Sequence, residues 1–271
     1  MNFRPGLTFR LSAFLASIFS FAAGASAQFV KFDDLASRVL KEVKPYKPRL
    51  VAVADFRSPD QTGLQGHYFA WLLSNHLKVR AEKKFEVTGH QGFDDDLAAL
   101  HVTVAQLVPG VEFRTAASGI GADILVTGSV ERRERSYVLK VVPIHVADEK
   151  VLGTIEESLP ITEFTESLVT PFPGRTSKAE MLGVAMPVCI HCPDPGYSDL
   201  ARSEKISGTA ILLVQVLVDG TVGQIRPQKM LGYGLDEKAY YAIKNWKLKP
   251  AMKDGNPVAV VVPVEVSFRL Y

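Results

Sequence analysis

The clearest pattern of apolar and polar positions lies near the end of the chain, in residues 258–270. Every second residue there is apolar, and a period of two predicts a β-strand with one buried face. Pro263 lies on the other face. Because proline has no N–H to donate, it is tolerated where one side of a strand is unpaired or bulged, and it therefore predicts an edge strand. The apolar face expected to pack on a helix consists of Val258, Val260, Val262, Val264, Val266, Phe268 and Leu270.

Two strand-like runs and a helix precede this strand. Residues 208–218 and 221–231 flank Asp219-Gly220, a dipeptide typical of tight β-hairpin turns. A helix is predicted from Leu235-Asp236 to Pro250, because proline ends a helix. The expected order of elements is therefore ββαβ. The buried face of the helix is predicted to contain Ala239, Tyr240, Ile243 and Trp246.

The predicted edge strand has two opposite interpretations. An exposed edge invites another chain to add a strand through main-chain hydrogen bonds. Glu265, Arg269 and Pro263 are equally the residue types that block such pairing. The residue types alone do not separate a docking edge from a protected one.

The upstream part of the chain has a different pattern. Apolar residues at helical spacing predict an amphipathic helix in residues 29–43, within an N-terminal segment 28–47. Residues 48–160 combine helices with strands and end in an alternating meander, which predicts an α/β domain. The expected fold class is thus α+β, an α/β domain followed by a small ββαβ domain in residues 192–271. The expected strands of the α/β domain are residues 50–56, 85–88, 122–130, 137–146 and 151–159, and its helices are residues 64–79, 111–122 and one beginning near residue 97.

Between the two predicted domains, residues 161–191 have the loose pattern of a linker, with one helical turn around Glu163 to Leu168. Cys189 and Cys192 lie at its end in C-x-x-C spacing, and Pro193 places them in a turn rather than at the start of a helix. Two cysteines cannot complete a tetrahedral zinc site, and no histidine follows Cys192 as haem attachment requires. We therefore expect a disulfide, provided the chain is exported to an oxidising compartment.

The first 27 residues are expected to direct export. Arg4 and Arg10 precede an apolar run, and Ala25-Ser26-Ala27 has the small residues of a cleavage site, as in a secretory signal peptide. This predicts a periplasmic location; if the segment is not cleaved, it anchors the protein in the inner membrane. The net charge of +2 is too small to indicate nucleic-acid binding.

No known catalytic motif occurs in the chain, so we do not expect an enzyme, a cofactor or a metal site. The six histidines are scattered without metal-ligand spacing. Asp94, Asp95 and Asp96 form the one dense acidic group, and acids at a helix start are usually caps that complement the helix dipole.

The C-terminal segment resembles the TonB C-terminal domain family. The motifs that carry this resemblance, in order, are Pro195-x-Tyr197 with Ala201-Arg202, Gly208-Thr209, Val218-Asp219-Gly220, Gly234-Leu235-Asp236, Trp246-Lys247-Leu248-Lys249-Pro250-Ala251, Asp254-Gly255-Asn256-Pro257-Val258 and Phe268-Arg269-Leu270.

The resemblance implies a module that adds the plug-exposed segment of an outer-membrane TonB-dependent receptor to its edge strand, in energy-coupled transport across the outer membrane. The ExbB–ExbD motor is an implied partner if the N-terminal segment is retained, and a homodimer formed by paired edges is a further possibility. Carried over to this chain, the docking residues are Pro195, Tyr197, Arg202, Val258, Val260, Val262, Val264, Val266 and Phe268.

Three features depart from that family. Ser198 follows Tyr197 where the family usually has proline, the N-terminal apolar segment looks cleavable, and the linker is shorter than the usual proline-rich spacer. The alternative function is therefore a periplasmic assembly or adaptor protein that is not coupled to the proton motive force. The upstream runs VAVADF and ADILVTGSV are similar to the amino-terminal domain of TolB and to FlgO-like periplasmic domains.

Overall fold

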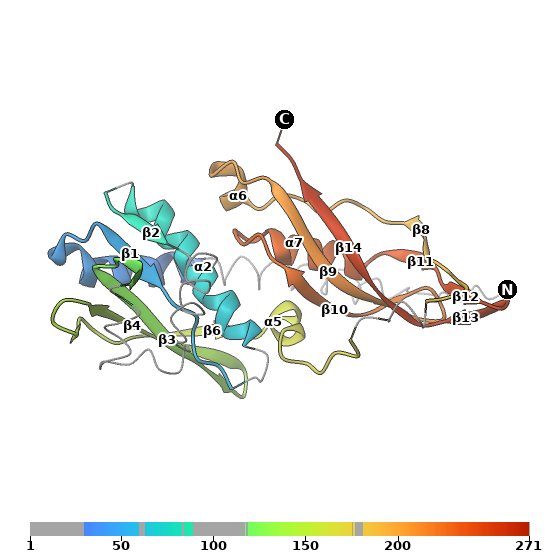
Figure 1. The fold of residues 1–271 in the computed structure, drawn as a ribbon, viewed down its shortest axis with the longest axis horizontal. Coiled ribbons are helices and arrows are strands. Elements are labelled where there is room, and N and C mark those ends of the chain that lie inside the picture. Colours follow the sequence, from blue (N-terminus) through green and yellow to red (C-terminus); the bar gives the residue numbers. More distant parts are fainter. Residues whose placement is uncertain are drawn as a thin grey trace, which may run out of the picture.

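The computed structural model describes residues 30–59, 63–82, 84–88, 117, 119–174, 176 and 181–270. The predicted signal segment, the acidic residues Asp94 to Asp96 and most of the predicted helix at 111–122 lie outside the described residues. The described chain forms an N-terminal unit and a C-terminal unit side by side, and both helices and sheets occur in an α+β arrangement (Figure 1).

The N-terminal unit contains a mixed sheet in the order β2-β1-β3-β4-β5, with β6 also paired to β4. The first three strands of this order are parallel, and the strands that follow β3 in the chain are antiparallel. Its strands are β1 (Leu50–Val53), β2 (Glu86–Thr88), β3 (Ile124–Arg133), β4 (Ser136–His145), β5 (Lys150–Val151) and β6 (Ile155–Pro160).

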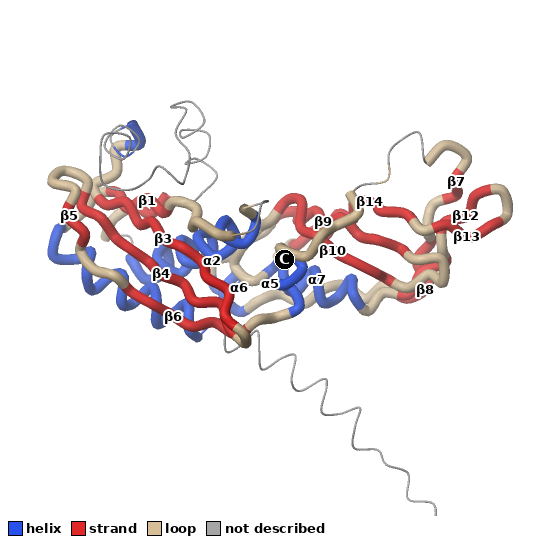
Figure 2. Tube along the Cα trace, turned by 90° about the horizontal axis from the view of Figure 1, so that it is seen from below, coloured by secondary structure: helices blue, strands red, loops and turns tan. Residues whose placement is uncertain are grey.

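Two helices cover one face of this sheet (Figure 2). Residues 30–43 are helical, with the short 3-10 helix η1 (Lys44–Tyr46) after them, and α2 (Leu64–Ala81) follows β1. Both helices occur where their apolar spacing predicts them. Phe32 and Phe69 join them through stacked rings whose centroids are 6.0 Å apart. Gly66 is needed for close packing, because a Cβ there would lie 1.8 Å from the Phe56 carbonyl oxygen.

The predicted last strand of the meander, residues 151–159, was wrong in one respect. The structure divides it into β5 and β6, with an interruption at residues 152–154 that contains Gly153. Both parts pair with β4, since Val151 lies opposite Ile144 and the β6 residue Ile155 lies opposite Val141. The alternating pattern shows which residues face the core. It does not reveal the break between β5 and β6, because the alternation continues across residues 152–154.

The C-terminal unit is built on a three-stranded antiparallel sheet in the order β10-β9-β14. Helix α7 packs on β9 and β10 and buries Ala239, Tyr240 and Ile243, as predicted. The elements are β9 (Gly208–Val216), β10 (Val222–Lys229), α7 (Leu235–Lys244) and β14 (Val260–Phe268), in the predicted ββαβ order.

Two predicted boundaries in this unit were wrong. Helix α7 ends at Lys244 rather than at Pro250, so Trp246 lies outside it. The strand predicted from Val258 is interrupted at Ala259. Short strands occupy the intervening chain and pair with residues from the predicted linker: β11 (Lys247–Lys249) with β8 (Val188–His191), and β12 (Ala251–Lys253) with both β13 (Asn256–Val258) and β7 (Val184–Ala185).

Helix α5 (Glu163–Ser167) lies between the two units (Figure 1). Its Phe164 is fully buried, with its ring centroid 5.1 Å from that of Tyr68 and 5.5 Å from that of Tyr240. The Tyr68 hydroxyl donates a hydrogen bond to the Glu237 carboxylate of α7. The two units therefore share one continuous hydrophobic core.

None of the described helices combines the length and apolarity that crossing a bilayer requires.

Candidate partner-docking edge

Strand β14 lies at one edge of the three-stranded sheet. It pairs with β9 over nine residue pairs, from Val260 opposite Val216 to Phe268 opposite Gly208, without a register shift. On its other side, the part of the chain that the structure describes places no strand beside it. This is the edge position that Pro263 predicts.

The contacts of Val261 show which backbone groups face away from β9. Its N–H donates to Thr176 Oγ1 at 2.7 Å, and its carbonyl oxygen accepts from the Thr176 N–H at 3.2 Å. Backbone groups of alternate residues in a strand point to the same side. The outward groups of β14 therefore belong to Val261, Pro263, Glu265 and Ser267. Pro263 lacks its N–H on the open side, where no β9 bond is lost.

The side chains of the apolar residues predicted as docking residues lie on the core face of the sheet, as the alternating pattern also predicts. Val260, Val266 and Phe268 are 3%, 6% and 2% exposed, and Val262 and Val264 are half-buried on the same core face. Val258 belongs to β13. By the same alternation, the backbone groups of the even-numbered β14 residues face β9. The side chains of the even-numbered residues stabilise the edge strand by packing into the core. A partner would pair with the outward backbone groups of the odd-numbered residues.

Tyr197, also predicted as a docking residue, lies against the last residue of β14, and Arg202, another predicted docking residue, lies over the Tyr197 ring. The Tyr197 ring meets the Phe268 ring edge to face at 5.5 Å, and its hydroxyl donates to the Ile206 carbonyl at 3.0 Å. The Arg202 guanidinium lies 5.8 Å from the centre of the Tyr197 ring. Pro195 is half-buried in the segment leading to this group.

Ser198, the departure from the family pattern, has a structural role. It is the N-cap of the short helix α6 (Asp199–Ser203), and its Oγ accepts from the Ala201 N–H at 3.1 Å. The same hydroxyl donates to the Tyr233 carbonyl oxygen, just before α7. A proline could make neither contact, so serine here joins the Tyr197 segment to the start of α7.

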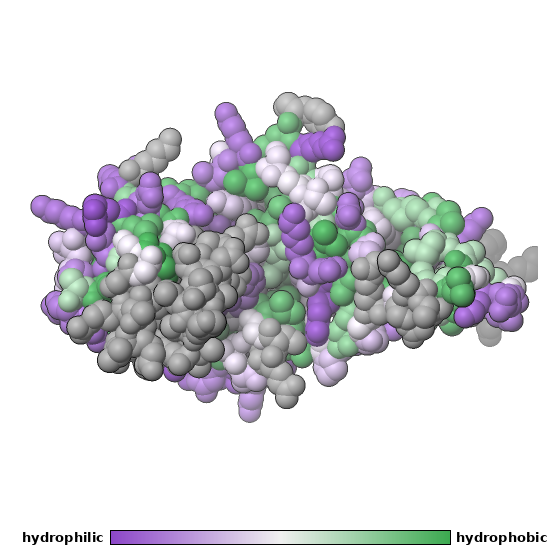
Figure 3. Space-filling model, in the orientation of Figure 1, coloured by the Kyte–Doolittle hydropathy of each residue, from purple (hydrophilic) through white to green (hydrophobic). Residues whose placement is uncertain are grey.

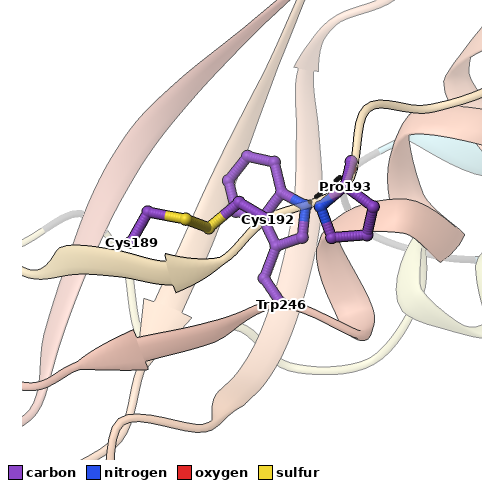
Figure 4. Close-up of a disulfide and its surroundings, with 4 residues drawn as sticks. All are labelled: Cys189, Cys192, Pro193 and Trp246. Atoms are coloured by element: carbon purple, nitrogen blue, oxygen red, sulfur yellow. Dashed lines mark hydrogen bonds between the residues drawn. A yellow bond between two sulfur atoms is a disulfide. The ribbon is translucent and has the colours of Figure 1, made fainter.

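At the far end of the same unit, Cys189 and Cys192 form a disulfide with a Cα–Cα distance of 6.0 Å (Figure 4). Cys189 is in strand β8, so the pair does not lie in a simple turn. The Trp246 Nε1–H donates to the Pro193 carbonyl oxygen at 3.1 Å. The disulfide and the indole both hold the chain that enters the domain.

Replacing both cysteines with serine is expected to lower the free energy of unfolding by no more than about 2 kcal/mol, because the closed loop is short and little chain entropy is removed. Urea unfolding of the wild type and of the double variant Cys189→Ser/Cys192→Ser measures the difference. A loss well above that range would show that the disulfide does more than close a short loop.

Large exposed apolar side chains gather near this disulfide. Figure 3 shows apolar surface at this end of the molecule, away from the N-terminal unit. The large exposed apolar residues at this end include Leu182, Met186, Val188, Ile190 and Met252. They belong to or adjoin the short strands β7, β8 and β12.

A buried acid lies behind the sheet at the start of α7. Asp236 is 2% exposed, and its two carboxylate oxygens accept from the N–H groups of Leu231 at 2.8 Å and Gly232 at 2.7 Å. Burial and the neighbouring Glu237 raise the pKa of Asp236 to about 7, although both N–H groups favour the ionised form. Burial also raises the pKa of Glu237. These acids hold the start of α7 and are not exposed to a partner.

Sequence reasoning missed Thr176, treated Glu265 as a residue of the polar face that could also block pairing, and gave Ser267 no role beyond that face. The position of Pro263 was an available signal, since the residues two and four positions further share its outward backbone direction. No cluster of potential metal ligands occurs among the residues that the structure describes.

The family model described as the Gram-negative bacterial TonB protein C-terminal matches residues 193–270. The chain is 30% identical over 108 residues to Protein TonB of Vibrio cholerae, covering 36% of this chain and 43% of that protein. It is 35% identical over 82 residues to Protein tonB2 of Pseudomonas aeruginosa, covering 30% of each. The chain thus spans less than half the length of these relatives.

Among solved structures, the C-terminal domain of LpoB from Escherichia coli aligns with 51% of this chain and 98% of that domain, at 14% identity and a TM-score of 0.38. TolB from Acinetobacter baumannii aligns with 82% of this chain and 50% of that protein, at 10% identity and a TM-score of 0.26. Neither likeness supports a functional assignment. The resemblance of the N-terminal unit to TolB is therefore only weakly matched.

Proposed function

We propose that this protein acts in the periplasm by adding an extended segment of an envelope partner to the open edge of β14, because residues 193–270 match the family model of the Gram-negative bacterial TonB protein C-terminal. The observation that carries the proposal is the outward row of backbone groups at Pro263, Glu265 and Ser267. The partner we propose is the plug-exposed segment of an outer-membrane TonB-dependent receptor. The protein's role is binding rather than catalysis.

Three properties of the edge favour strand addition. Glu265 and Ser267 each present an N–H and a carbonyl oxygen, and their side chains are exposed. The core face of β14 is fixed by Val260, Val266 and Phe268, so the edge is ordered before a partner arrives. A preformed edge lowers the conformational entropy that binding has to overcome.

The two versions of this function differ in what the N-terminus does. Energy-coupled transport requires contact with the ExbB–ExbD motor through a retained membrane segment. The adaptor alternative is favoured by the shared core at Phe164, which joins the docking module to a folded N-terminal unit. Mass spectrometry of the native protein distinguishes them: an intact Met1 in the inner membrane supports motor coupling, and a mature N-terminus at Gln28 contradicts it.

Replacing Glu265 with proline is expected to weaken binding of a receptor-derived peptide at least tenfold. The substitution removes an outward N–H and places a ring against the incoming strand. The fold should tolerate it, because Pro263 already occupies a position whose backbone groups point to the same side of β14. Isothermal titration calorimetry of the full chain with a synthetic plug-segment peptide measures the affinity.

The matched control is Glu265→Ala, which keeps the N–H and should lose only the small contribution of one exposed charge, so that it binds far more tightly than Glu265→Pro. Circular dichroism should show the same fold for both variants. Equal binding by Glu265→Pro and Glu265→Ala would rule out strand addition at this edge, and loss in both would assign binding to the carboxylate instead.

A further inference from the structure

A segment of this chain already contacts the proposed docking edge. We define the strap as residues 170–174 together with Thr176; it follows helix α5. Its Thr170 carbonyl oxygen accepts from the Arg226 guanidinium of β10, and the Phe172 ring centre lies 5.2 Å from that guanidinium. At its other end, Thr176 makes both hydrogen bonds to Val261 of β14. The strap is thus attached to the two outer strands of the sheet.

The strap crosses the face of the sheet opposite α7. Ile225 of β10 is buried on the α7 face, so the next residue, Arg226, points to the other face. Arg226 and Pro263 both lie opposite Leu213 of β9, which places them on that same face. Figure 2 shows the segment after α5 passing over β9 and β10 towards the beginning of β14.

The burial of Val261 supports this placement. Its side chain belongs to the face that the alternating pattern assigns to solvent, together with the exposed Pro263, Glu265 and Ser267. Yet Val261 is only 6% exposed. The contact with Thr176 gives a physical reason, because it brings the strap against the beginning of β14.

The strap also occupies outward backbone hydrogen-bonding groups of β14. Both outward groups of Val261 are bonded to Thr176, and the next outward residue, Pro263, offers a carbonyl oxygen but no N–H. The first outward positions with both groups are therefore Glu265 and Ser267.

We propose that the strap is a resident occupant of the docking edge, which confines a partner strand to residues 263–268 and must leave Val261 before a longer strand can pair along the whole of β14. This inference rests on the proposed function, since it concerns regulation of the same edge. The exposed charges in and just after the accessible half also specify the partner. A short extended segment with a basic residue beside Glu265 and an acidic residue near Arg269 fits it best.

The variant Thr176→Val tests the strap, because valine keeps the shape and the N–H of threonine but removes the oxygen that accepts from the Val261 N–H. Thr176→Ser is the matched control that keeps this oxygen. In the full chain, hydrogen exchange of the Val261 amide is expected to be at least tenfold faster in Thr176→Val than in the wild type, and unchanged in Thr176→Ser. Equal exchange in all three proteins would overturn the proposal.

A second measurement tests the competition directly. A receptor plug-segment peptide long enough to span Val261 to Phe268 should bind Thr176→Val about threefold to tenfold more tightly than the wild type, the effect of one lost competing hydrogen bond. A peptide that spans only Glu265 to Phe268 should bind both alike. Equal binding of the long peptide to both proteins would overturn the strap's role as a competitor. If neither peptide binds any protein, the proposed function fails, and the Val261 exchange rates still decide whether the strap occupies the edge.

Discussion

Replacing Phe164 with alanine is expected to lower the free energy of unfolding by about 3–5 kcal/mol. The Phe164 ring is fully buried between Tyr68 of the N-terminal unit and Tyr240 of the C-terminal unit. Alanine would leave a cavity between the Tyr68 ring and the Tyr240 ring, where the two units meet. Urea unfolding followed by circular dichroism measures the loss.

The matched control is Phe164→Leu, which retains most of the apolar volume and should cost less than about 1.5 kcal/mol. Because the two units share a core, the wild type should unfold in one transition, and Phe164→Ala should separate the unfolding of the units. A change below 1 kcal/mol for the alanine variant, on the scale of a surface substitution, would contradict the shared core.

The second large effect concerns pH and Asp236. The pKa of this buried carboxyl is about 7 in the folded protein, against a usual value of 3.8. Between pH 3.8 and about pH 7, the folded state therefore keeps a proton that the unfolded state has released. The stability that this group contributes is fully present below about pH 4 and is lost as pH rises through about 7. At 1.36 kcal/mol for each pKa unit, the loss reaches about 4 kcal/mol.

His76 acts in the opposite direction over part of the same range. Burial lowers its pKa from 6.5 to about 4, so its contribution to stability rises as pH increases between these values. The difference between the wild type and Asp236→Asn isolates the carboxyl, because His76 is present in both. This difference in unfolding free energy should decrease from pH 4 to pH 7.5. Asp199→Asn, at the exposed start of α6, should reproduce the wild-type dependence. A constant difference for Asp236→Asn would show that the carboxyl is ionised throughout.

The pattern of side chains was enough to predict most of the C-terminal sheet. Asp219-Gly220 marks the turn between β9 and β10, and Pro263 marks the edge strand. The end of α7 was missed because Trp246 continues the helical spacing of Ala239 and Ile243, although it already precedes β11. Apolar spacing records which side chains face the core, and a short strand after a helix can preserve that spacing.

The proposed docking edge was predictable only in part, for a different physical reason. Alternation separates core from surface side chains, but it does not state which backbone groups face the neighbouring strand. The family resemblance named the even-numbered valines as docking residues, and the alternating pattern assigned their side chains to the core face, where the structure places them. Thr176 was beyond reach of pattern reasoning, because its contact with Val261 joins positions 85 residues apart along the chain.

The uninterrupted register between β9 and β14 has a mechanical consequence. A partner strand paired to β14 would transmit tension along the strand direction, at right angles to the interstrand hydrogen bonds. Such a load shears all nine residue pairs together instead of opening them one after another. The strap contacts β14 through a single residue pair at the beginning of the strand, so no other pair carries part of the load. Under tension it would yield well before the sheet, and the docking edge would become longer while the sheet stayed intact.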